Sequence, residues 1–80
     1  MLSDYIRAAM KKAKYERLED GSYFGRIPGI RGVWANEETE ATCREELRNA
    51  LEDWLIFSIR HGYRIPTIAG INLNAPVTTS

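Results

Sequence analysis

The strongest constraint on the fold is a long stripe of apolar side chains between residues 40 and 61. These side chains recur at three- and four-residue steps, the spacing of one face of an α-helix. Thr39 precedes the stripe and is a good N-cap residue, and Gly62 follows it and can adopt the left-handed conformation that closes a helix. A helix from residue 40 to 61 would be about 33 Å long, at roughly 1.5 Å per residue. The stripe consists of Ala41, Cys43, Leu47, Ala50, Leu51, Trp54, Leu55 and either Ser58 or Ile59.

Ahead of this helix, turn signals divide the chain into short extended segments. Asp20 and Gly21 form a pair that favours a tight β-hairpin turn, and residues 28–32 contain a proline and two glycines that mark a second reversal. The segments on either side of these turns are predicted to be three antiparallel strands in a meander, at residues 14–18, 23–27 and 33–35.

Two further elements complete the expected fold. Apolar residues recur at helical spacing between residues 2 and 13, which predicts a short amphipathic helix. Residues 71–73 can add a short fourth strand, and the polar stretch 74–80 is expected to be a frayed tail. The prediction is therefore one α+β domain over residues 1–80, with an N-terminal helix, a three-stranded antiparallel meander and a long helix.

Composition narrows the classes of function. Eleven Lys and Arg residues balance eleven Asp and Glu residues, whereas proteins that grip a phosphate backbone usually carry a basic excess. The single cysteine excludes an intrachain disulfide and suits a reducing compartment. The first residues carry no basic n-region, and no apolar run approaches the ~20 residues that span a bilayer. We expect a cytoplasmic protein that does not enter the membrane.

The strands are expected to have one face toward the helices and one face free. Under period-two alternation, the helix-facing side carries Gly25, Ile27, Val33 and Ala35. The opposite side then carries Phe24, Arg26 and Trp34. Large aromatic side chains on a helix-free face form an exposed patch of the kind that marks interaction surfaces. The alternative is a register one residue away, which would place Trp34 in the core.

The residues that could take part in catalysis or bind a metal have simpler structural explanations. His61 could be a general base or a metal ligand, but it lies at the predicted helix end, where a cation is favoured by the helix dipole. Cys43 lies on the apolar stripe and is expected to be an inert, mostly buried thiol. Trp54 lies in the middle of the same stripe, which favours core packing. The acidic residues crowd the first turns and polar face of the long helix, and they show no clear convergence on a metal. They are Glu37, Glu38, Glu40, Glu45, Glu46, Glu52 and Asp53.

Residues 23–35 carry a family resemblance. They read Tyr-Phe-Gly-Arg-Ile-Pro-Gly-Ile-Arg-Gly-Val-Trp-Ala, an aromatic strand, an Ile-Pro turn and a Gly-hydrophobic strand. This segment resembles the HicB family of antitoxins, and the likeness extends over about residues 13–66. Two departures are visible. Many family members have a Glu-Glu-Ala run where this chain has Ala41, Thr42 and Cys43, and many carry a C-terminal DNA-binding domain for which this sequence has no segment.

The resemblance implies a partial ribonuclease-H-like fold without that enzyme's catalytic carboxylates. It also implies a role in a bacterial type II toxin-antitoxin system, in which such a protein binds and blocks a small mRNA-cleaving HicA toxin. Family members commonly self-associate, so a homodimer or homotetramer is expected. Direct DNA binding is not expected.

These arguments predict a non-catalytic binding protein, without cofactor or metal, that neutralises a HicA-like toxin. The predicted partner or oligomer interface consists of Phe24, Arg26, Ile30, Arg31 and Trp34. One alternative is a stand-alone homo-oligomeric structural or regulatory module with no toxin partner. Another is a small hydrolase that retains a ribonuclease-H-like metal site, which would require carboxylates from several elements to meet around a divalent ion.

Overall fold

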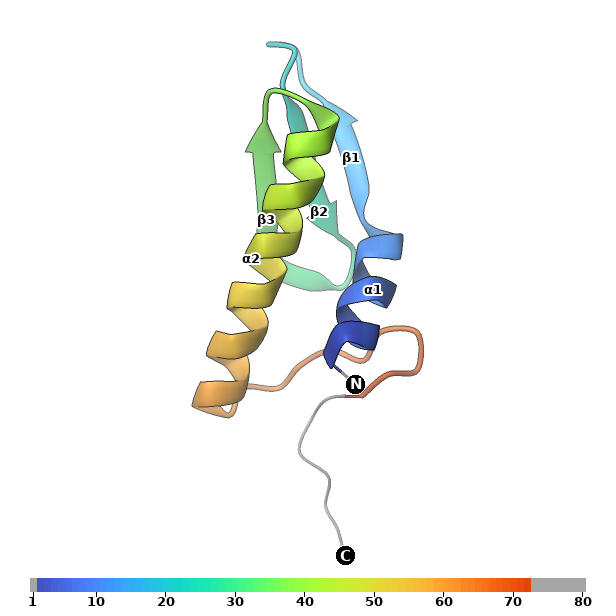
Figure 1. The fold of residues 1–80 in the computed structure, drawn as a ribbon, viewed down its shortest axis with the longest axis vertical. Coiled ribbons are helices and arrows are strands. Elements are labelled where there is room, and N and C mark those ends of the chain that lie inside the picture. Colours follow the sequence, from blue (N-terminus) through green and yellow to red (C-terminus); the bar gives the residue numbers. More distant parts are fainter. Residues whose placement is uncertain (1, 73–80) are drawn as a thin grey trace, which may run out of the picture.

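The computed structural model describes residues 2–72, and these form the predicted α+β arrangement (Figure 1). Three strands pair in the order β1-β2-β3, each antiparallel to its neighbour. Both helices contact the sheet, and α2 packs mainly on β3 and β2. Neither helix combines the length and apolar character that a bilayer crossing needs. The elements are α1 (Leu2–Lys12), β1 (Lys14–Arg17), β2 (Tyr23–Ile27), β3 (Ile30–Glu37) and α2 (Glu40–His61).

Helix α2 begins and ends where its flanking residues predict. The Thr39 side chain accepts a hydrogen bond from the backbone N–H of Thr42 at 3.0 Å. At the other end Gly62 has φ 70°, and its N–H donates to the Ile59 carbonyl while the N–H of Tyr63 donates to the Ser58 carbonyl. This pair of bonds is a Schellman motif, which satisfies carbonyls that the helix end would leave unpaired.

Local hydrogen bonds shape the turn of the first hairpin, and a glycine on its second strand permits close packing against α2. Asp20 accepts bonds from the hydroxyl and the backbone N–H of Ser22, which hold the pKa of the Asp20 carboxyl below its ordinary value. Gly25 lies on β2 beneath Cys43 of α2. A Cβ at this position would lie 3.0 Å from Cys43 Sγ and 3.0 Å from a ring carbon of Tyr15, so glycine permits the close approach.

The predicted faces of the sheet are confirmed by burial. Gly25, Ile27, Val33 and Ala35 are buried beneath the helices. Arg26 and Trp34 are exposed on the opposite face, with Phe24 half-buried beside them. The register pairs Arg26 with Trp34, which excludes the slip that would have turned the indole into the core.

Ile30, which was predicted to belong to the interface, is the exception because its side chain is buried. The strand register shifts between Arg26 and Ile27, so that Ile27 pairs with Ile30 while Arg26 pairs with Trp34. The extra residues on β3 include Gly32, whose φ of 83° breaks the simple alternation of side chains. Ile30 therefore points to the same side as Val33 and is only 4% exposed.

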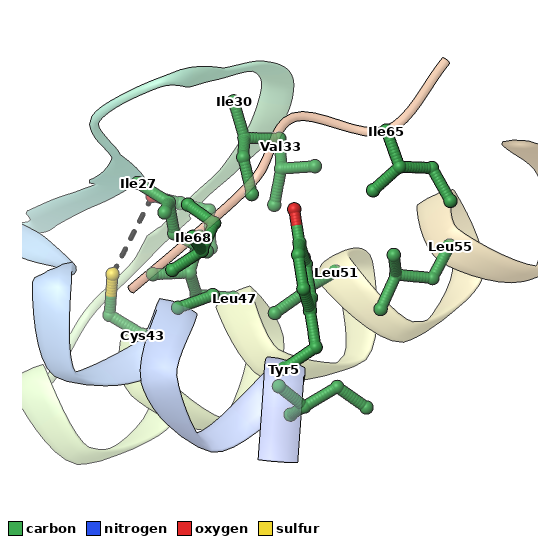
Figure 2. Close-up of a cluster of buried hydrophobic side chains, with 13 residues drawn as sticks. Tyr5, Ile27, Ile30, Val33, Cys43, Leu47, Leu51, Leu55, Ile65 and Ile68 are labelled. Atoms are coloured by element: carbon green, nitrogen blue, oxygen red, sulfur yellow. Dashed lines mark hydrogen bonds between the residues drawn. The ribbon is translucent and has the colours of Figure 1, made fainter. Parts of the chain in front are cut away.

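The core lies between the sheet and both helices, and the segment after α2 closes its far end (Figure 2). Ile65 and Ile68 return into this core, and the Tyr5 hydroxyl donates a 2.6 Å hydrogen bond to the Pro66 carbonyl. Burial raises the pKa of Tyr5, so the phenol stays a neutral donor. At the end of the α2 stripe, the buried residue is Ser58 and not Ile59.

The possible fourth strand does not join the sheet within residues 2–72. Ala69 and Gly70 have φ values of 50° and 80°, and they form a tight turn that folds Ile71 back onto Ile68. The two isoleucines exchange backbone bonds of 3.2 and 2.7 Å. Leu73 and the predicted frayed tail, 74–80, lie outside the described residues.

Candidate interaction surface on the sheet

The helix-free face of the sheet carries an exposed aromatic pair. Trp34 is 58% exposed, and its ring stacks on Phe24 with a centroid separation of 6.0 Å and an interplanar angle of 23°. Arg26 lies directly opposite Trp34 in the strand register. The pair fixes the indole in one orientation while leaving more than half of it open to a partner.

All five predicted interface residues line one shallow groove of about 400 Å³ at the β2–β3 turn. Phe24 and Arg26 come from β2, and Arg31 and Trp34 come from β3. Ile30 also lines the groove, although its side chain belongs to the core. The residues that the sequence singled out are therefore neighbours in space. We call this the sheet groove.

A second groove, of about 310 Å³, lies between β3 and α2 and shares Trp34 with the sheet groove. Its acidic side chains are Glu37 on β3 and Glu46 and Asp53 on α2. From the sequence, these carboxylates are interpreted as helix-dipole and solubility residues. A signal for the groove is nevertheless present, because Glu46 and Asp53 are seven residues apart and so lie on one helix face. We call this the acidic groove.

Basic side chains gather elsewhere, in a groove of about 360 Å³ between the two helices. Arg7 and Lys11 from α1 face Arg44 and Arg48 from α2. The Arg44 guanidinium lies 5.8 Å from the centroid of the Tyr15 ring. The formal net charge of zero therefore conceals separate acidic and basic surfaces.

The side chains considered for catalysis do not converge. Among residues 2–72 there is no group of three or more His, Cys, Asp and Glu residues that could hold a metal ion. His61 packs against Phe57 and Tyr63, with ring centroids 4.3 and 5.7 Å away. Trp54 is half-buried against the core, in agreement with its predicted packing role.

The Cys43 thiol is fully buried, as expected. Its Sγ lies 3.5 Å from the carbonyl oxygens of Tyr23 and Ala35, and burial raises the pKa of the thiol above its ordinary value. Figure 2 shows this side chain pointing from α2 toward the sheet.

Native Cys43 is therefore expected to react slowly with a thiol reagent such as Ellman's reagent. The raised pKa lowers the thiolate fraction at mildly alkaline pH, and burial blocks access, so the rate should be at least ~100-fold below that of the denatured chain. Time courses with and without guanidinium measure this ratio. Equal rates in the two conditions would contradict the buried, inert thiol.

Helix α2 has a second apolar surface that the sequence interpretation missed. Ile56, Phe57 and Ile59 near its C-terminal end, and Tyr63 just beyond it, are between 50% and 56% exposed. The sequence predicts one buried stripe on this helix, yet residues 54–59 form a run in which only Ser58 is polar. A helix that is apolar on both sides normally has both sides covered. We call these four residues the α2 patch.

Comparisons with known proteins agree with this fold. A search of curated proteins gives no match. The crystal structure of TTHA0281 from Thermus thermophilus is similar, with 36% sequence identity, 95% coverage of both chains and a TM-score of 0.87. Residues 4–66 match the family model described as UPF0150-like. This match spans most of the 80 residues, and the chain therefore belongs to the UPF0150-like family.

Proposed function

We propose that this protein is a non-catalytic antitoxin-like protein that binds and neutralises a small, HicA-type, mRNA-cleaving toxin. The observation that carries the proposal is the Trp34 ring, which is fixed against Phe24 and open on the helix-free face of the sheet. Tryptophan and arginine are among the residues most enriched at energetically dominant interface positions. Trp34 and Arg26 lie opposite each other here.

The acidic groove on the α2 side of Trp34 favours basic side chains on that part of the partner, whereas Arg26 and Arg31 line the sheet groove on its other side. An enzyme that cleaves RNA must hold a phosphate backbone, and such proteins usually present Lys and Arg side chains. The acidic groove places Glu37, Glu46 and Asp53 next to the same indole. Complementary charges speed association and disfavour wrong partners. A basic toxin docked on Trp34 would have its RNA-binding residues drawn toward these carboxylates, which would block access of RNA.

The resemblance of residues 23–35 to HicB antitoxins supplies the identity of the toxin class in this proposal. The proposal includes a partial ribonuclease-H-like fold. The resemblance implies such a fold, and the chain has a β1-β2-β3 meander followed by a helix, which is consistent with it. A cytoplasmic location follows from the same proposal, since the toxin acts on mRNA. The alternative function, a homo-oligomeric module without a toxin, would use the same exposed rings.

Co-expression tests the proposal. The reading frame next to this protein's gene is induced in a bacterial host, alone and together with this chain, and growth and mRNA integrity are followed. The wild-type chain should restore growth. Joint replacement Trp34→Ala and Arg26→Ala should abolish the protection because it removes the ring and the charge that face the partner.

A matched control separates loss of binding from loss of folding. Tyr63 and Arg17 are an exposed aromatic and an exposed arginine that lie outside the sheet groove. Joint replacement Tyr63→Ala and Arg17→Ala should leave protection intact. Protection that survives the loss of Trp34 and Arg26, or that is absent with the wild-type chain, would count against the proposal.

A further inference from the structure

We propose that the groove between α1 and α2 binds the phosphate backbone of a single-stranded nucleic acid. The groove has a volume of about 360 Å³ and carries four cationic side chains, Arg7, Lys11, Arg44 and Arg48. No carboxylate is among the described residues that line it. We call it the basic groove. It is separate from the sheet groove, and its role does not depend on the toxin.

The four cations form two pairs with helical spacing. Arg7 and Lys11 are four residues apart on α1, and Arg44 and Arg48 are four residues apart on α2, so each pair lies on one face of its helix. Like charges at this spacing destabilise a helix. The helix dipole favours Lys11 in the last turn of α1, but Arg44 and Arg48 lie in the N-terminal half of α2, where it does not favour a cation. A bound anion would relieve the repulsion within both pairs.

Two of the cations have weak partners that a phosphate can replace. Arg7 lies 3.2 Å from Asp4, and Arg48 lies 3.4 Å from Glu52. Both pairs lie within one helix and are open to solvent, so water and salt screen them. Phosphate oxygens match the planar fork of an arginine side chain and accept two N–H bonds from it. A phosphate backbone in the groove can therefore displace these exposed carboxylates.

The uncharged lining of the basic groove favours a single strand over a duplex. Tyr15 and Met10 line it beside the cations, and the Arg44 guanidinium lies 5.8 Å from the centroid of the Tyr15 ring. Unpaired bases stack on aromatic rings and on guanidinium planes, whereas the bases of a duplex are already stacked and paired. The volume is at the small end of the ~300–1,000 Å³ typical of ligand sites, which suits a narrow strand.

The surroundings of the basic groove do not suit a protein or a lipid surface. Protein interfaces depend on buried apolar anchors, and helices that bind membranes insert apolar side chains. The large exposed apolar side chains of residues 2–72 all lie outside the groove. They are Leu2, Trp34, Ile56, Phe57, Ile59 and Tyr63. Attraction between charges therefore dominates recognition at this groove, as it does for a polyanionic strand.

Positive and negative charges gather at opposite edges of the sheet. The edge strands are β1 and β3 (Figure 1). The basic groove reaches β1 through Tyr15, and the acidic groove reaches β3 through Glu37. A strand in the basic groove would thus be kept away from the acidic groove, so the formal net charge of zero does not oppose its binding.

Fluorescence anisotropy tests the proposal with short, labelled strands of polyuridylate and polythymidylate, which distinguish RNA from DNA. Four phosphate contacts predict that the logarithm of the affinity falls with the logarithm of the salt concentration with a slope of about −2.8, at roughly −0.7 per contact. Joint replacement Arg44→Gln and Arg48→Gln should reduce this slope to about −1.4 and weaken binding at least ~10-fold at low salt. Binding of either strand with this salt dependence would support the proposal.

A matched control removes the same charge from another surface. Arg60 and Arg64 are exposed and lie outside the basic groove. Joint replacement Arg60→Gln and Arg64→Gln should leave affinity and slope unchanged, and circular dichroism checks that both double variants fold. Unlabelled duplex RNA, polyglutamate and phosphatidylserine vesicles should each displace the labelled strand less well than the unlabelled strand does. No binding at low salt, equal losses in the two double variants, or a competitor as effective as the unlabelled strand would overturn the proposal.

Discussion

Replacement of Leu51 by alanine is expected to lower the free energy of unfolding by about 3 kcal/mol, within the ~2–5 kcal/mol range of such core truncations. Leu51 is completely buried in the middle of α2, in the layer that joins the helix to the sheet and to Tyr5. The removed methyl groups lose their contacts, and the close-packed surroundings cannot fill the cavity. In a domain of this size, such a loss is a large part of the total stability.

Chemical denaturation of the purified variant measures this effect, with Ile56→Ala as the matched control. Ile56 is on the same helix but is 55% exposed, so its truncation should change the stability of the monomer by less than about 1 kcal/mol. The comparison is made at several low protein concentrations, because any self-association would add to the apparent stability. Equal losses for the two variants would mean that α2 does not divide into a core face and an outer face.

Replacement of Trp34 by alanine is expected to weaken toxin binding at least ~30-fold, which corresponds to the ~2 kcal/mol that defines a dominant interface residue. The indole joins the sheet groove to the acidic groove, so its loss removes the centre of the proposed contact. The fold should survive. Trp34 is mostly exposed, and the stacking on Phe24 that would be lost contributes only about 0.5–1.5 kcal/mol.

Isothermal titration of the toxin into each variant measures the affinity, and Tyr63→Ala is the control. Tyr63 and Trp34 are almost equally exposed, at 56% and 58%, but Tyr63 lies beyond the end of α2 and outside the sheet groove. The Tyr63→Ala variant should bind the toxin as tightly as wild type. If both replacements reduced affinity to the same extent, the sheet groove would have no special role.

Most of the fold could be predicted because local signals agreed with one another. Thr39 and Gly62 bracket α2, and both adopt the expected capping geometry. The alternation along β2 and β3 likewise assigned Phe24 and Trp34 to the outer face. Each of these predictions depends on a few adjacent residues, whose conformational preferences act over short range.

The errors arose where long-range geometry decides. The register shift before Ile30 could not be read from alternation, because a bulge is a property of two paired strands. The acidic groove needs β3 and α2 placed side by side, which spacing within α2 alone does not reveal. The α2 patch had a visible signal in residues 54–59, but the buried stripe and the outer patch overlap in sequence and separate only once the core is defined.

Light scattering of the purified chain, with and without the product of the reading frame next to its gene, tests the central claim that this protein works by binding another protein through its sheet. The prediction is a complex of defined stoichiometry with the wild-type chain, and no complex when Trp34 and Arg26 are both replaced by alanine. A mixture that never forms a complex, or a complex that persists without Trp34 and Arg26, would contradict it.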